Sequence, residues 1–482
     1  MLNSKKKIYH LYIILFCLIF AVFFRGYNIN FDNFWFDEIL SFWITDNKIS
    51  LEESFERHRE IEQIPYLFHF ILKIFFEVFS YDSDLGRYTS LIFNIMGIIL
   101  ATLLCKIVRN NNSYLIALFL FSTNIFLINY SQEFRPYSLI FFLCALNLLI
   151  FYKLYNHSKD QDFNFYSITL MTLSNILMII SHPFSLIIFI SASFFLILNK
   201  LTNQNISTNL IYSFILSFIF SIIYFYMLID NLNSFPSWIK QPDISFYTNF
   251  YFSNFFGSRL MGLIHLIILI SLLGITYKKL KNKNFDLNIF IFIIFLSYFL
   301  PLMYGFLFRP IIFPRYIIFV LIPIIILLSI LIYEIKSKSV RNFIIFIIVL
   351  LNIGNHFSES TFQQLYSEKQ NYKPYLEKMI NILKKNDEKS YTIDMSLNES
   401  KKLTAYQAIN NYIYNFNIFE NSKIEYMTSE QFLNSKKRKI WILCLPDVVF
   451  DRCKKINSSS YYKILKREKI PGIKLILVEK LI

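Results

Sequence analysis

Long apolar stretches recur along most of the chain and are separated by short polar connections. A helix of roughly 20 apolar residues crosses a bilayer, because without water every backbone group must pair within the element. Eleven stretches fit this description, so the pattern predicts a mostly α-helical, polytopic membrane protein. These stretches are residues 8–25, 88–105, 114–130, 138–155, 165–181, 184–199, 210–229, 260–276, 287–303, 317–334 and 342–354.

One further apolar stretch, Pro65 to Phe79, is short and interrupted by His69, Lys73 and Glu77. If it does not cross, almost all lysines between the spans lie on the side of the N-terminal lysines, as the positive-inside rule requires. We therefore expect residues 64–79 to form an interfacial helix outside the membrane. The first span is then an uncleaved anchor with a cytoplasmic N-terminus.

The chain changes character after residue 354. Residues 355–482 contain no apolar span, and they carry 22 Lys or Arg against 14 Asp or Glu. A periodic helix over 375–383 and strand-like runs at 391–394, 440–445 and 473–478 predict a small α/β domain. With eleven spans in the membrane part, residues 1–354, this domain lies outside the cytoplasm.

Composition excludes several classes of protein. Hydrophobic residues make up 55% of the chain and charged residues only 17%, which excludes a soluble enzyme, a disordered chain and a disulfide-stapled secreted domain. The five cysteines define no metal or disulfide framework. Cys444 and Cys453 lie in the tail, where an oxidising compartment allows a disulfide.

Arginine and lysine are distributed differently between the two sides. The spans place most arginines in or beside outward-facing segments, whereas the lysines face inward. A guanidinium binds phosphate and carboxylate through a rigid two-pronged fork, so outward arginines indicate an anionic ligand. The alternative for any one of them is a local carboxylate or a lipid headgroup. The outward arginines are Arg25, Arg57, Arg59, Arg87, Arg135, Arg259, Arg309 and Arg315.

Two adjacent carboxylates, Asp37 and Glu38, follow the first span in an aromatic setting. A carboxylate in a region of low dielectric must be held by hydrogen-bond donors or serve as a base. The alternative is an ordinary helix N-terminus, which also favours acidic residues.

Other polar side chains are predicted at the outer ends of separate spans: Arg87, Arg135, Tyr137, His182 and Arg315. Each has a structural alternative, because prolines nearby mark helix starts, a histidine is often satisfied locally, and tyrosines populate the aromatic belt. All of them are nevertheless predicted on the outer side of the membrane, which favours one functional site.

At these residues the chain resembles the GT-C class of membrane glycosyltransferases, in the branch of aminoarabinose transferases, rhizobial lipopolysaccharide sugar transferases and protein O-mannosyltransferases. The resemblance covers most of the membrane part. It departs from the branch's Pro-Pro-Leu run, whose first proline is Ile64 here. The matching segments are Trp35 to Glu38, Gln63 to Leu67, Arg87, Gln132 to Ser138, Ser181 to Pro183, and Phe313 to Tyr316.

The resemblance implies inverting transfer of a sugar from a polyprenyl-phosphate donor to a lipid, polysaccharide or protein acceptor. It places the reaction on the outer face of a bacterial cytoplasmic membrane. No nucleic acid is expected as a partner.

It also implies roles for individual residues. Asp37 is expected to be the base and Glu38 to orient the acceptor or Asp37, although these two roles are interchangeable. Arg135 and Arg87 are the first candidates for binding the donor phosphate. Tyr137, His182 and Arg315 are the second. No cofactor is expected, and a divalent cation at the Asp-Glu pair remains an alternative.

Two other functions stay open. A transporter or flippase of a lipid-linked glycan predicts charges buried within the spans and discontinuous helices in two related halves. An O-antigen polymerase or ligase predicts arginines in a large late outer loop, whereas the late loop at 230–257 contains none.

Overall fold

Two compact units make up the computed structural model of the chain. The bundle unit comprises Met1–Ile29, Glu62–Phe68 and Arg87–Ser367, and the loop-tail unit comprises Asn30–Ile61, His69–Gly86 and Glu368–Ile482. The predicted boundary after residue 354 stays a prediction. The structure describes residues 2–29, 34–62, 64–156, 164–202, 206–234, 239–281, 287–358, 390–395, 407–408, 411, 423–426, 434, 436, 438–444, 461–470 and 473–481.

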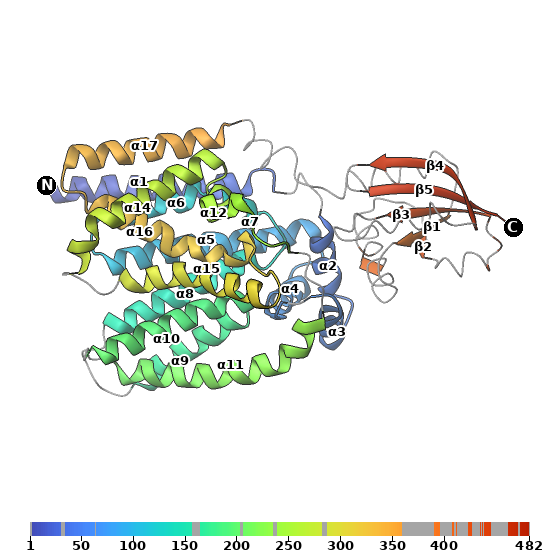
Figure 1. Cartoon of the computed structure of the whole chain (residues 1–482), viewed down its shortest axis with the longest axis horizontal. Coiled ribbons are helices and arrows are strands. Elements are labelled where there is room, and N and C mark those ends of the chain that lie inside the picture. Colours follow the sequence, from blue (N-terminus) through green and yellow to red (C-terminus); the bar gives the residue numbers. More distant parts are fainter. Residues whose placement is uncertain are drawn as a thin grey trace. The chain divides into compact units, whose positions relative to one another are not determined.

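Helices form the bundle unit, and every predicted span coincides with helix (Figure 1). The α-helices with more than ten residues are α1 (Leu2–Gly26), α5 (Ser83–Val108), α6 (Ser113–Thr123), α8 (Tyr137–Asn156), α9 (Phe165–Ile179), α10 (Leu186–Leu201), α11 (Thr208–Ser234), α14 (Arg259–Lys281), α15 (Asn288–Leu307), α16 (Leu321–Tyr333) and α17 (Lys338–His356). The shorter helices are α7 (Ile125–Ser131), η1 (Pro183–Ser185), α12 (Ile244–Asn249), α13 (Phe252–Phe255) and η3 (Pro314–Val320).

The chain is a multi-pass membrane protein. Among the described residues, seven helices are long and apolar enough to cross a bilayer, and the bent pair α6 and α7 makes an eighth. Three further apolar helices are shorter: Phe165–Ile179, Thr208–Tyr224 and Arg259–Ile275. The predicted number of eleven spans stays a prediction.

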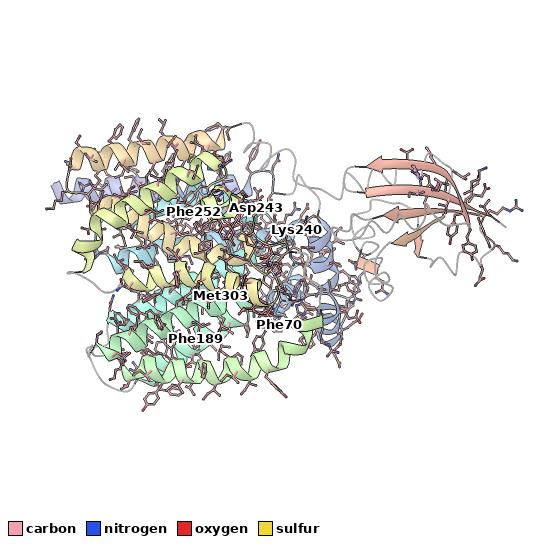
Figure 2. All side chains as sticks on the ribbon, viewed as in Figure 1. Phe70, Phe189, Lys240, Asp243, Phe252 and Met303 are labelled. Carbon is pink, nitrogen blue, oxygen red and sulfur yellow. The ribbon has the colours of Figure 1, made fainter. Side chains whose placement is uncertain are left out.

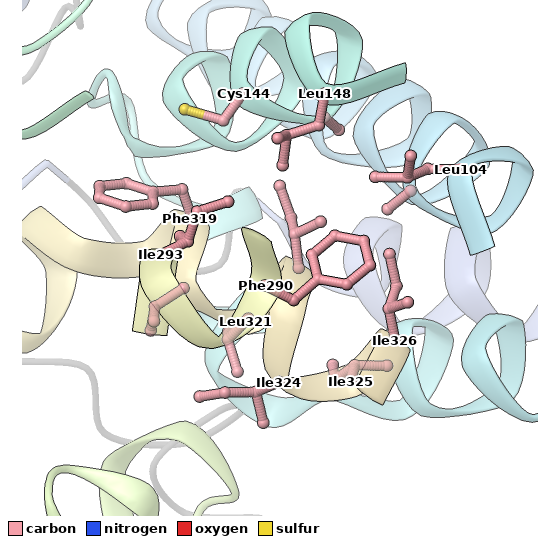
Figure 3. Packing of buried hydrophobic residues seen from close by; sticks show 14 of the residues in the cluster. Leu104, Cys144, Leu148, Phe290, Ile293, Phe319, Leu321, Ile324, Ile325 and Ile326 are labelled. Atoms are coloured by element: carbon pink, nitrogen blue, oxygen red, sulfur yellow. The ribbon is translucent and has the colours of Figure 1, made fainter. Parts of the chain in front are cut away.

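Helix α16 lies at the centre of the apolar core. It is hydrophobic on all sides, which is typical of a helix surrounded by other helices, and every residue from Leu321 to Ile332 is buried. Ile325 and Ile326 lie close to Phe290 of α15 (Figure 3). Side chains fill the spaces between the other helices as well, and Phe189 of α10 stacks on Phe214 of α11 at 5.1 Å (Figure 2).

One span is broken between α6 and α7, which meet at an angle of 54°. A break within the apolar region leaves backbone carbonyls that need donors. The guanidinium of Arg25 donates to the carbonyl oxygens of Ser122 (2.9 Å) and Phe121 (3.0 Å). Nε2 of His356 lies 2.8 Å from the carbonyl oxygen of Thr123. Buried polar side chains therefore stabilise the break.

The loop-tail unit contains helices α2 (Phe36–Ile44) and α3 (Leu51–Ile61) and most of α4 (Leu67–Val78), together with a five-stranded sheet. The helix expected over 64–79 is thus present as α4, and its position in a membrane stays a prediction. Arg57 of α3 ties α3 to α2, because its guanidinium covers the Trp43 ring at 4.4 Å and donates to the Trp43 carbonyl at 3.0 Å.

The sheet has the strand order β2-β1-β3-β5-β4. β3 is parallel to β1 and antiparallel to β5, and its fully buried Trp441 is in register with Leu477. The three predicted strand runs are confirmed as β1, β3 and β5, whereas the sequence pattern missed β2 and β4. The helix expected over 375–383 and Cys453 lie outside the described residues. The strands are β1 (Ser390–Met395), β2 (Lys423–Tyr426), β3 (Lys439–Cys444), β4 (Tyr462–Ile470) and β5 (Ile473–Lys480).

Candidate functional site

The two adjacent carboxylates occupy the first turn of α2, yet their environments differ. Glu38 is 1% exposed, and its Oε2 accepts a hydrogen bond from the Trp35 backbone N–H at 3.2 Å. This bond caps the N-terminus of α2. For Glu38, the alternative of an acidic residue at an ordinary helix N-terminus is therefore confirmed. Asp37 is half-buried. Of the two, Asp37 is the more accessible to a substrate.

A chain of buried polar side chains supports α2 behind Asp37. The Ser41 hydroxyl donates to the Asp37 carbonyl at 3.0 Å, and Nε2 of His69 lies 3.3 Å from the same hydroxyl. The rings of His69 and His58 are 5.0 Å apart. Helices α3 and α4 thereby fix the backbone of Asp37 through Ser41.

Phe42 anchors the other end of α2. Tyr81 stacks on its ring at 4.0 Å, and the Tyr81 hydroxyl lies 2.7 Å from the Phe42 carbonyl oxygen and 2.8 Å from Oδ1 of Asn411. Burial, with Asp46 nearby, raises the pKa of Tyr81 well above its usual value. Tyr81 therefore remains a neutral donor. Asn411, from the tail of the chain, also donates to the Asp46 carboxylate at 2.8 Å.

In the bundle unit, four polar and aromatic side chains from three separate segments form a cluster. The guanidinium of Arg315 lies 5.5 Å from the ring centre of Tyr137 and 5.7 Å from that of Tyr316. The His182 ring is 5.3 Å from Tyr316. This cluster joins the start of α8, the loop before η1, and η3.

Proline sets the local backbone of two of these segments. Pro183 begins η1 and Pro314 begins η3, and the preceding residues, His182 and Phe313, are extended as a residue before proline prefers. The alternative that Pro183 marks a helix start is confirmed. The prediction of one functional site is compatible with this, because the same backbone geometry directs His182 and Arg315 to one cluster.

His182 is a neutral imidazole inside this cluster. Burial, reinforced by the positive charges of Arg135 and Arg315, lowers the pKa of His182 to about 3. Its Nδ1 accepts from the Phe184 backbone N–H at 3.2 Å, so the ring proton is on Nε2. The cluster thus combines the Arg315 cation with a neutral imidazole donor, and Arg135 adds a second positive charge nearby.

Arg135 lies in the turn between α7 and α8 and pairs with Glu62. Its Nη1 donates to Oε1 of Glu62 at 2.5 Å and its Nη2 to Oε2 at 3.3 Å, with both side chains largely buried. Sequence analysis did not single out Glu62, because it is one acidic residue among several in and just after α3. Only the fold reveals its partner.

Arg87 is buried near the start of α5, where its Nη1 donates to the Ile29 carbonyl at 2.9 Å. One turn later, the Ser90 hydroxyl lies 3.5 Å from the Arg135 carbonyl oxygen. Arg87 therefore holds the chain after α1, whereas the Arg135 backbone contacts α5.

Comparison with known proteins identifies the fold. No protein-family model matches the sequence, and no curated protein does either. Among solved structures, ArnT from Cupriavidus metallidurans in the apo state is similar over 86% of this chain and 87% of its own, with a TM-score of 0.53 and 7% identity. The fold is that of the GT-C membrane glycosyltransferases.

A second GT-C structure agrees. AglB, the oligosaccharyltransferase from Archaeoglobus fulgidus in complex with an inhibitory peptide and a dolichol-phosphate, is similar over 98% of this chain and 74% of its own, with a TM-score of 0.52 and 12% identity. At such identities the likeness concerns the fold, which confirms the fold class predicted from the sequence.

Within this GT-C fold, the predicted site residues fall into two groups. Arg87, Arg135, Tyr137, His182 and Arg315 belong to the bundle unit, where the last four lie in or beside one cluster. The predicted acids Asp37 and Glu38 belong to the loop-tail unit.

A cavity of about 520 Å³ lies away from these groups. It is lined by residues near the C-terminal ends of α5 and α8, including Lys106 and Lys153, whereas Arg87 and Tyr137 are at the N-terminal ends of the same helices. It is therefore separate from the candidate site. No three His, Cys, Asp or Glu side chains group as metal ligands within the described parts of the chain.

Proposed function

We propose that the protein is a membrane glycosyltransferase that moves a sugar from a polyprenyl-phosphate donor to a lipid, polysaccharide or protein acceptor. We further propose that it works at the outer face of a bacterial cytoplasmic membrane, with a cytoplasmic N-terminus and an extracytoplasmic tail. The GT-C fold supports the reaction class. The inward-facing lysines predicted from the sequence support the orientation.

The observation that carries this proposal is the cluster of Arg315, His182, Tyr137 and Tyr316, with the charge of Arg135 nearby. As the glycosidic bond breaks, negative charge grows on the departing lipid phosphate. Fixed guanidinium groups stabilise this charge more in the transition state than in the ground state. The AglB structure with dolichol-phosphate is consistent with a lipid phosphate ligand. Arg135 and Arg315 are the proposed phosphate-binding residues, with Arg87 stabilising the chain nearby.

Asp37 is the proposed base. The acceptor hydroxyl oxygen attacks the anomeric carbon, the bond from that carbon to the phosphate oxygen breaks, and the hydroxyl proton moves to Asp37. Displacement from the opposite side inverts the anomeric configuration. Glu38 is bonded to the start of α2, which favours Asp37 over Glu38 for the proton transfer.

A deletion strain tests the proposed function. We expect mass spectrometry of its surface glycans to show one sugar missing and its polyprenyl-phosphate donor accumulated. Expression of the wild-type protein is expected to restore the sugar. Unchanged glycans and donor would contradict the proposal.

The same experiment distinguishes the other functions. A flippase deletion leaves a lipid-linked precursor on the inner side, with no sugar missing from the glycans that are still made. A polymerase or ligase deletion leaves complete repeat units unpolymerised or unattached. Either result would replace the glycosyltransferase proposal.

A further inference from the structure

Glu62 occupies the guanidinium fork of Arg135, the residue proposed above to bind the donor phosphate. Carboxylate and phosphate bind a guanidinium in the same two-pronged geometry, so one guanidinium edge accommodates one of them at a time. Glu62 takes that edge with both of its oxygens. We infer that Glu62 is an internal competitor of the donor phosphate, released from Arg135 when the donor binds. This inference rests on the proposed function.

The described residues 62 and 64–68, which we call the strap, contact the turn that contains Arg135 at two places. Glu62 pairs with Arg135 at one end of this strap, and at the other end the buried ring of Phe68 lies 5.9 Å from that of Phe134, the neighbour of Arg135. Glu62 directly follows α3, and α4 begins at Leu67. The aromatic contact holds the strap in place when the ion pair opens.

Charge supplies the reason for an exchange. Arg135 and Glu62 are both largely shielded from water, where an unpaired ion is costly, so Arg135 needs an anion at all times. Glu62 provides one before the donor arrives and a lipid phosphate provides it afterwards. Glu62 is the more exposed partner, with 11% of its side chain accessible against 6% for Arg135. In this exchange Glu62 is the partner that moves, because the phosphate replaces it on the guanidinium.

The competition sets the affinity for the donor phosphate. When an internal ligand occupies a site, the apparent dissociation constant for an external ligand is the intrinsic constant divided by the fraction of molecules in which the site is open. Replacing Glu62 by glutamine keeps the shape and removes the competing charge. We expect Glu62→Gln to lower the dissociation constant for a polyprenyl monophosphate by about tenfold or more.

Binding of farnesyl phosphate, a short polyprenyl monophosphate, to the full-length protein in detergent tests this inference. The tightening is expected for farnesyl phosphate and not for farnesol, which has the same chain without the phosphate. Glu60→Gln is the matched control, because Glu60 is an exposed glutamate of α3 two residues earlier. We expect this control to bind like the wild type. Unchanged or weaker binding by folded Glu62→Gln would overturn the inference.

Hydrogen exchange of the wild-type protein provides a test that needs no variant. Farnesyl phosphate is expected to increase amide exchange in the peptide containing Glu62, because the ion pair that holds the strap opens. Slower exchange there would show that Glu62 stays bound to Arg135. Slower exchange in a wild-type protein that still transfers sugar would refute the competitor role alone. A wild-type protein that neither binds farnesyl phosphate nor transfers sugar would refute the proposed function.

Discussion

Single residues in the bundle unit acquire their properties from their neighbours. Arg315 lies among three aromatic rings, including Phe313 at 5.0 Å. A guanidinium over aromatic faces keeps its charge and has a fixed direction, which suits it to a phosphate of a lipid donor. The residue types of this cluster were predictable from the sequence, because their spans place them on one side. The mutual distances and the Glu62 partner required the fold.

The pH dependence of stability follows from His182. Its pKa is about 3 in the folded protein and about 6.5 in an unfolded chain, so the unfolded state binds more protons below pH 6.5. Its contribution to stability is therefore lost as the pH falls from about 6.5 toward 3. We expect His182→Gln to flatten the decline of the melting temperature between pH 6.5 and 4.5. The slope difference corresponds to at most about 1.4 kcal/mol per pH unit.

Parallel slopes for the two proteins over that range would show that His182 is not held neutral. Activity provides a second measurement. Because His182 is already neutral and does not titrate near neutral pH, His182→Gln is expected to leave the pH midpoint of sugar transfer unchanged even where the rate falls.

Among the elements, the broken span of α6 and α7 depends most on particular side chains. Arg25 is fully buried and also donates to Oδ1 of Asn94 on α5 at 2.8 Å. Sequence analysis grouped Arg25 with the outward arginines that indicate a ligand, yet Arg25 donates to three backbone carbonyls and to Asn94. A continuous apolar pattern over 114–130 predicted one helical span. The bend at Asn124 was not predictable, because its donors come from α1 and α17.

Replacement of Arg25 tests this account of the break. Arg25→Leu leaves the carbonyls of Phe121 and Ser122 without their donor, which is expected to destabilise the protein by about 2–4 kcal/mol. Thermal unfolding in detergent measures the loss.

The control is Arg59→Leu, since Arg59 is exposed on α3 and makes only a surface ion pair with Glu56. We expect its melting temperature to be close to that of the wild type. Equal stability of Arg25→Leu would show that the helix break is satisfied in another way.

At the scale of the whole molecule, the sequence predicted the GT-C fold and the positions of the apolar helices. The hydrophobic period is a strong signal for such helices, and motifs such as Trp35 to Glu38 carry the family resemblance. The grouping of residues 30–61 and 69–86 with the tail was not predictable, because it depends on long-range contacts such as that of Tyr81 with Asn411.

Topology is tested by cysteine labelling with an impermeant reagent in intact cells. Asn47 and Asn110 are exposed residues on predicted opposite sides, whereas Ser41 is buried and unsuitable. With Cys444 and Cys453 replaced by serine, we expect Asn47→Cys to react from outside and Asn110→Cys only after lysis. The reverse pattern would invert the proposed orientation.

The central claim is that Asp37 and Arg135 serve one sugar transfer. The most direct test is complementation of the deletion strain with Asp37→Asn or Arg135→Gln, followed by mass spectrometry of the surface glycans. Asp82→Asn, at an exposed carboxylate of the loop-tail unit, is the control. We expect transfer to fall about 100-fold or more in the first two variants and to remain normal in the control. Full restoration of the sugar by either Asp37→Asn or Arg135→Gln, at wild-type expression, would contradict the account.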